Sequence, residues 1–322
     1  MNMENRLLYL KPLAFILKVA LLFTVFSFMN FDSSLNLDYL NYKANYDYNW
    51  GQFEIGFELL SDLARYFNLD FESFWLSILI FQILLLSMLY RNNLVFIFAF
   101  PNLIYLSQGL LGTQVRFGLA VTFFLLLFSY FNRRRTFLYI SLFPILFHNA
   151  IVIFFALSLY MNLFFKNVQN FFSKRNIKAL IVYVSILLVI VTLIDTLLIN
   201  AGYDYYVGTK YQEGRSLAGL AYLFVHLFFV MFLLKLNAAN SNDKTAIYYK
   251  DWLVLSFFIL VFAIFFMGSS VISGRLTLVY TLLEPFILYW ILTAFKDNVV
   301  RGFLFISFSF ISYSKLLILN LN

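Results

Sequence analysis

Long apolar segments separated by short polar and basic segments run through nearly the whole chain. Runs of roughly 20 apolar residues recur, and each is long enough to cross the hydrocarbon core of a bilayer as a helix. The predicted membrane helices cover residues 12–30, 73–90, 94–111, 115–131, 179–199, 217–236, 251–267, 276–295 and 303–319. With residues 136–165, this pattern predicts an all-α, polytopic integral membrane protein with about ten membrane segments. We expect residues 1–322 to form a single transmembrane domain.

Residues 136–165 form an apolar segment that has basic residues at both ends, Arg133–Arg135 before it and Lys166 after it. Basic residues favour the cytoplasmic side of a membrane, so a single crossing would place one basic end on the wrong side. The sequence therefore favours a broken or re-entrant helical hairpin, with Pro144 and His148 near its turn. A single tilted helix is the alternative.

Two polar segments, residues 31–72 and 200–216, are predicted to be outer loops. Residues 53–67 of the first loop have helical periodicity. One predicted face is apolar and consists of Phe53, Phe57, Leu60, Ala64 and Phe67. A second face is charged and consists of Glu54, Glu58, Asp62 and Arg65. This separation predicts an amphipathic helix at the membrane interface.

Composition and charge limit the possible functions. The chain is 62% apolar and 12% charged, and it contains no cysteine, which excludes disulfides, thiol nucleophiles and iron–sulfur sites. The net charge of +7 comes from short loops between apolar runs, where basic residues set orientation, so we expect no nucleic-acid partner. With the N-terminus inside, most basic residues fall on the cytoplasmic side.

Three of the few outer basic residues are candidates for chemistry. Arg116 lies in the first turn of the helix predicted at 115–131, and Arg275 directly precedes the helix predicted at 276–295. Arg215 ends the second outer loop. Helix N-termini attract anions, and a guanidinium binds phosphate through two parallel hydrogen bonds. These arginines predict an anion site; contacts with lipid headgroups are the alternative.

The remaining titratable candidates are two histidines and several carboxylates. His148 could act as a base near neutral pH, or it could be a hydrogen-bonded residue in a packed turn. His226 is predicted to be structural, and Glu284 is a candidate buried carboxylate. Glu54 and Glu58 are expected on a solvated face, with sugar binding as the alternative. Because the sequence has no recognisable metal-binding motif, we expect neither a metal nor a cofactor.

The segments around these residues resemble a known family. Residues 114–120 (Gln-Val-Arg-Phe-Gly-Leu-Ala) and 146–150 (Leu-Phe-His-Asn-Ala) resemble the helix start and the Phe-His-x-Ala element of the EpsG-like polysaccharide polymerases, relatives of Wzy. Residues 54–60 resemble the acidic-x-Gly-aromatic segment of that family. Residues 273–276 (Ser-Gly-Arg-Leu) resemble its C-terminal arginine. Asn149 departs from the small or hydroxyl residue found in many relatives.

The resemblance implies a GT-C-like polymerase architecture and a metal-independent glycosyltransferase. Such an enzyme joins oligosaccharide repeat units carried on undecaprenyl diphosphate, at the outer face of the bacterial inner membrane, to make O-antigen, capsule or exopolysaccharide. Its implied partners are this lipid-linked glycan, the lipid bilayer and a chain-length regulator. The implied catalytic residues are Arg116, His148 and Arg275. The implied substrate-binding residues are Glu54, Glu58, Gln114, Tyr211 and Arg215.

Two other functions fit the same pattern. Broken helices and buried charges are typical of transporters, so a flippase for lipid-linked oligosaccharide is one alternative. A membrane O-acyltransferase with His148 as its catalytic residue is the other. Loss of the outer arginines should then matter little.

Overall fold

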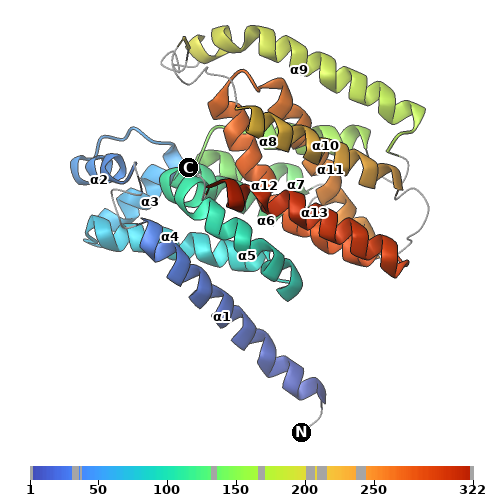
Figure 1. Ribbon diagram of the computed structural model, residues 1–322. Coiled ribbons are helices and arrows are strands. Elements are labelled where there is room, and N and C mark those ends of the chain that lie inside the picture. The colour runs from blue at the N-terminus through green and yellow to red at the C-terminus, as the bar shows by residue number, and fades with distance from the viewer. Residues whose placement is uncertain are drawn as a thin grey trace. The chain divides into compact units, whose positions relative to one another are not determined.

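A computed structural model describes residues 3–30, 36, 38–131, 136–165, 171–200, 207–208, 216–236 and 244–319. These residues form helices and no strand (Figure 1). Six helical segments among them are long and apolar enough to cross a membrane: 71–89, 93–113, 174–200, 217–236, 270–294 and 298–316. The prediction of an all-α polytopic membrane protein is therefore confirmed. The number of ten segments stays a prediction.

The chain forms two compact units, Met1–Leu159 and Tyr160–Asn322. The helices of the first unit are α1 (Met3–Asn30), α2 (Tyr39–Tyr48), α3 (Ile55–Tyr66), α4 (Phe71–Leu89), α5 (Asn93–Gln108), α6 (Val115–Phe131) and α7 (Thr136–Ile140). It also contains a π-helical turn, η1 (Gly109–Thr113), a 3₁₀ turn, η2 (Phe143–Leu146), and most of α8 (Ile151–Phe164). The prediction of a single transmembrane domain stays a prediction.

The second unit contains α9 (Lys174–Asn200), α10 (Leu217–Leu236), α11 (Lys244–Phe265), α12 (Ser270–Ala294) and α13 (Asn298–Leu319). Its core lies where α11 packs against α12, and Trp252 stacks on Phe286 there with ring centroids 4.2 Å apart. The bounds of α10 match the prediction. Arg215, Tyr211 and most of the predicted outer loop 200–216 lie outside the described residues.

Close backbone packing shapes the first unit around the junction of α5 and α6. The predicted break between these helices is the π-helical turn η1. A Cβ atom on Gly118 of α6 would lie 2.2 Å from the carbonyl oxygen of Leu110, so only glycine fits there. Elsewhere in the unit, the Lys18 ammonium of α1 donates to the carbonyls of Tyr90 and Arg91, which directly follow α4, at 3.0 and 2.8 Å.

The predicted outer loop 31–72 contains two helices, and the sequence analysis missed α2. This helix buries Tyr39, Tyr42, Asn45 and Tyr46, whose spacing places them on one face. The three tyrosines form an aromatic core with Phe57, Phe71, Phe74 and Trp75. The predicted helix at 53–67 is confirmed as α3. Its interfacial location stays a prediction, and its exposed apolar stripe is not the predicted face but Ile55, Leu59, Leu63 and Tyr66.

The predicted break in residues 136–165 is confirmed. After α7, Pro144 lies in the 3₁₀ turn η2, a turn holds His148 and Asn149, and α8 starts at Ile151. Neither arm has the length of a full membrane span, since the apolar segments cover only 136–146 and 151–164. Entry and exit on the same side stays a prediction.

The predicted start of the helix at 276–295 was wrong. α12 starts at Ser270, where the Ser269 hydroxyl accepts a hydrogen bond from the amide of Ile272 at 3.5 Å. Arg275 therefore lies in the second turn of α12 and does not precede it. The unpaired N–H groups of a helix belong to its first four residues, so Arg275 lies beyond the strongest part of that anion site.

Candidate active site

Three candidate residues that are far apart in the sequence meet in the first unit. The Nη1 atom of Arg116 forms an ion pair with Oε2 of Glu54. The other carboxylate oxygen of Glu54 accepts a hydrogen bond from the amide of Asn149 at 3.4 Å and lies 3.9 Å from Nδ1 of His148. The first turn of α6, the start of α3 and the turn before α8 thus build one site.

Glu54 reaches this site because of its position at the start of α3. It is the N-cap residue, yet its side chain caps no α3 amide among the described residues and turns to Arg116. Two residues later, a Cβ atom on Gly56 would lie 2.8 Å from the carbonyl oxygen of Leu146. Glycine at this position lets α3 approach η2, and this close approach places Glu54 beside the turn that carries His148.

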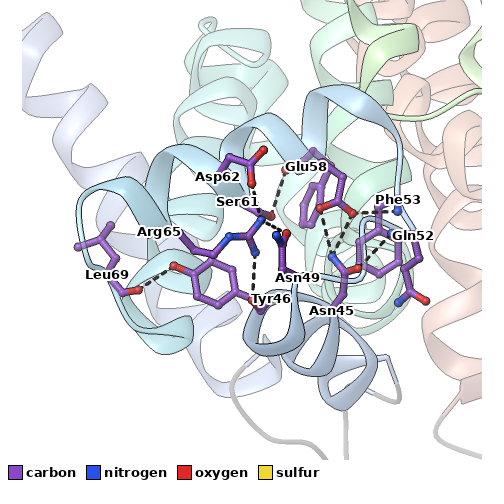
Figure 2. A network of polar contacts seen from close by, with 11 residues as sticks. Asn45, Tyr46, Asn49, Gln52, Phe53, Glu58, Ser61, Asp62, Arg65 and Leu69 are labelled. Atoms are coloured by element: carbon purple, nitrogen blue, oxygen red, sulfur yellow. Dashed lines mark hydrogen bonds and ion pairs between the residues drawn. The ribbon is translucent and has the colours of Figure 1, made fainter.

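A network of hydrogen bonds fixes the turn that precedes Glu54 (Figure 2). Oε1 of Glu58 accepts from the side-chain amide of Asn45 at 3.0 Å and from the backbone amide of Phe53 at 2.9 Å. Oδ1 of Asn45 accepts from the amide of Gln52 at 3.2 Å. Glu58 therefore holds the backbone next to Glu54. The Glu58 carboxylate accepts both of these hydrogen bonds within the protein. A contact between Glu58 and the substrate stays a prediction.

Arg65 of α3 forms hydrogen bonds with the residues at the C-terminal end of α2. Its guanidinium donates to the carbonyl of Tyr46 at 3.0 Å and to Oδ1 of Asn49 at 2.7 Å, and it pairs with Asp62 at 2.5 Å (Figure 2). These bonds join the C-terminal end of α2 to the last turn of α3. Glu58 and Arg65 of the predicted charged face thus join α2 to α3. The expected solvated face is wrong for Glu54, which is only 12% exposed and pairs with Arg116.

The Arg116 guanidinium lies against aromatic rings. It is 4.0 Å from the ring centroid of Phe53 and 5.8 Å from that of Tyr42, which stabilises the cation. Arg116 is the second residue of α6, where the positive end of the helix dipole disfavours a cation, and Glu54 compensates for this. Burial is the main cause that raises the pKa of Tyr42, so its phenol stays neutral at physiological pH.

Hydrogen-bonding capacity is left over at the site. Nε of Arg116 and Oε1 of Gln114 are buried and have no hydrogen-bond partner among the residues that the structure describes. The side chains of Glu54, Arg116 and His148 remain between 12% and 21% exposed, so the site is partly open. A ligand that reaches the site would find a donor group of Arg116 that has no partner among the described residues.

The ring of His148 has a defined orientation. Its Nδ1 accepts a hydrogen bond from the backbone amide of Ala150 at 3.2 Å, and its edge packs on Phe117 with ring centroids 5.1 Å apart. Because a backbone amide can only donate, the neutral ring carries its proton on Nε2. His148 in this state is a hydrogen-bond donor at Nε2.

Glu54 compensates the charge of Arg116, and the prediction that Arg116 binds an anion stays a prediction. The ion pair uses Nη1 of Arg116 and leaves the guanidinium with further N–H groups. Arg275 belongs to the second unit, and Gln114 follows η1 in the first. The roles predicted for Arg275, Arg215 and Tyr211 stay predictions. No sequence signal identified Asn45 or the Asn149 amide, because their partners are distant in sequence.

The sequence was compared with protein-family models, curated proteins and solved structures. The EpsG family matches residues 14–321, nearly the whole chain. Comparisons with curated proteins and with solved structures found no match. The family is associated with polysaccharide biosynthesis and glycosyltransferase-like polymerase activity. With a match over this length, the chain belongs to the EpsG family.

Proposed function

We propose that this protein joins oligosaccharide repeat units carried on undecaprenyl diphosphate, at the outer face of the bacterial inner membrane and without a metal ion. EpsG membership supports the polymerase class. The observation that carries the finer proposal is the Glu54 carboxylate, held between Arg116 and the His148 turn in a partly open site. A carboxylate, a guanidinium and an imidazole N–H are the groups that such a transfer needs.

In the proposed reaction, a hydroxyl oxygen of the acceptor sugar attacks the anomeric carbon of the donor sugar. The new glycosidic bond forms while the bond from that carbon to the diphosphate oxygen breaks. Glu54 takes the hydroxyl proton as general base. The bond electrons leave with the diphosphate, and the remaining N–H groups of Arg116 and Nε2–H of His148 donate to its oxygens. This assignment gives His148 a donor's role and makes Glu54 the base.

The test is the ladder of surface polysaccharide made by a deletion strain that expresses single variants. Glu54→Gln keeps the size of the side chain and its hydrogen-bonding shape but removes the base, so we expect polymerisation to fall by about 10²- to 10⁴-fold. Membrane protein level should stay unchanged. Glu58→Gln is the matched control, one turn along α3, and should retain most of the ladder.

The lipid-linked pool distinguishes the polymerase from a flippase. A polymerase defect leaves single repeats on the finished lipid, whereas a flippase defect strands repeat units at the inner face. A normal ladder from Glu54→Gln would contradict the proposal. Arg275→Ala, measured in the same assay, tests separately whether the second unit contributes an anion-binding residue. We expect this variant to make no long chains.

A further inference from the structure

The turn between α2 and α3 presents two exposed aromatic rings. Tyr48 and Trp50 are stacked, with ring centroids 5.7 Å apart and an interplanar angle of 18°. Their exposed fractions are 71% and 54%. Asn49 and Gly51, which alternate with the two aromatic residues, have positive φ angles of 52° and 62°.

The turn is held rigidly although its rings are exposed. The amide of Trp50 donates to the carbonyl of Asn45 at 3.3 Å, and the side-chain amide of Gln52 donates to Oδ1 of Asn41 at 3.1 Å. Arg65 holds Asn49 from α3 (Figure 2). A ligand that binds here would therefore order few groups of the protein, which favours binding by preformed surfaces.

The groups around the rings differ from those of a lipid-facing surface. Four exposed polar residues belong to the same turn or to α2: Asn41, Asp47, Asn49 and Gln52. The face of an aromatic ring is electron-rich and attracts the polarised C–H groups of a sugar ring. Side-chain amides can donate to and accept from sugar hydroxyls at the same time. The exposed stripe of α3, in contrast, presents Ile55, Leu59 and Leu63, which suit lipid.

We propose that Tyr48, Trp50 and Gln52, which lie within the six residues before Glu54, form a subsite that binds one sugar ring of the lipid-linked glycan. This inference rests on the proposed function, because it assigns the glycan to the turn that the Asn45–Glu58 network fixes next to the base. The outer face of the stacked pair packs on the apolar face of the sugar, and the side-chain amide of Gln52 binds its hydroxyls. The subsite increases the affinity for the glycan and sets its position along the site. Glu54 remains the residue that takes part in the reaction.

Tryptophan fluorescence can test the subsite directly. Of the four tryptophans, Trp75, Trp252 and Trp290 are at most 1% exposed, so acrylamide quenching of the purified protein reports on Trp50. The probe is the oligosaccharide repeat released from the lipid-linked pool of the producing strain by mild acid. We expect it to protect Trp50 from acrylamide. Brominated phospholipids in reconstituted vesicles should leave Trp50 unquenched.

Variants sharpen the measurement. Tyr48→Ala and Gln52→Ala should each raise the glycan concentration for half-protection by about tenfold, the effect of roughly one lost stacking or hydrogen-bonding contact. Tyr66→Ala is the matched control, since Tyr66 is 80% exposed and belongs to an aromatic pair with Phe67 on α3. It should not alter protection. Trp50→Phe should remove the quenchable emission and confirm the reporter.

The proposal is overturned if the glycan leaves quenching unchanged, or if brominated lipid quenches Trp50, which would make the pair an interfacial anchor. This outcome is distinct from failure of the proposed function. If the glycan does not protect Trp50 but the polysaccharide ladder still depends on Glu54, only the sugar-binding role of the turn is wrong. A ladder indifferent to Glu54 removes the polymerase mechanism whatever Trp50 reports.

Discussion

Each of the two units contains a carboxylate paired with a cation beside a histidine, but the two clusters differ in how far they are closed. In the first unit, Glu54 pairs with Arg116 near His148, and all three side chains are partly exposed. In the second unit, Glu284 pairs with Lys315 at 2.5 Å, and its carboxylate is fully buried.

Internal partners satisfy both oxygens of the Glu284 carboxylate in the second cluster. One oxygen of Glu284 accepts from Lys315, and the other accepts from the hydroxyl of Tyr222. Nδ1 of His226 lies 2.7 Å from the hydroxyl of Tyr280. These residues come from α10, α12 and α13, so the cluster joins three membrane helices. The predictions that Glu284 is a buried carboxylate and His226 a structural residue agree with these contacts.

The difference shows how to interpret ionisable groups in membrane helices. Such a group is costly in lipid and is usually taken as a sign of function. Here burial and bonding separate two cases. A cluster whose oxygens all have internal partners specifies helix packing. A cluster whose side chains stay partly exposed, as those of Glu54, Arg116 and His148 do, can be reached by a ligand.

The largest expected effect is the loss of one partner from the closed cluster. Lys315→Met leaves the Glu284 carboxylate buried without its cation, which should reduce the free energy of unfolding by about 3–5 kcal/mol. We expect the variant to be depleted from membranes and to unfold at a lower temperature in detergent. The double variant Glu284→Gln/Lys315→Met removes both charges and should recover most of this stability. If the single variant is as stable as the wild type, the cluster does not hold the helices together.

The open cluster should respond in activity and not in stability. Arg116→Lys keeps the positive charge beside Glu54 but loses the planar set of N–H groups, so we expect polymerisation to fall by about 10²-fold. The measurement is the polysaccharide ladder at matched protein level, with thermal unfolding as the control. A full ladder from this variant would show that a point charge suffices. The proposed contact with the diphosphate would then be wrong.

The sequence predicted the apolar helices well, because membrane length and hydropathy determine them almost alone. α10 matches residue for residue, whereas the start of α12 was placed six residues late because Ser269, Ser270, Ser273 and Gly274 are typical of a turn. The sequence analysis also predicted Arg116, His148 and Glu54, as separate candidate site residues. It could not show that Glu54 pairs with Arg116, 62 residues away, because that contact depends on how α3 packs against η2.

Backbone packing at Gly56 gives the next prediction. Gly56→Ala would place a Cβ atom 2.8 Å from the Leu146 carbonyl, so α3 must move away from η2 and Glu54 away from His148. We expect a loss of about 1–3 kcal/mol in stability together with a shortened ladder. Gly274→Ala is the matched control in the second unit, since its added Cβ meets no atom within 4 Å. A variant at Gly56 with normal activity would mean that the approach of α3 to η2 does not position the base.

The smallest expected effect separates a donor from a base at His148. The amide nitrogen of glutamine can take the place of Nε2 and still donate, but a glutamine amide cannot accept a proton near neutral pH. If His148 only donates to the leaving diphosphate, His148→Gln should keep polymerisation within about tenfold of the wild type, the effect of roughly one weakened hydrogen bond. The measurement is the rate of chain growth in membranes supplied with lipid-linked repeats, compared with Glu54→Gln. A His148→Gln variant as inactive as Glu54→Gln would indicate that His148 is the general base. Glu54 would then be the group that orients the His148 ring.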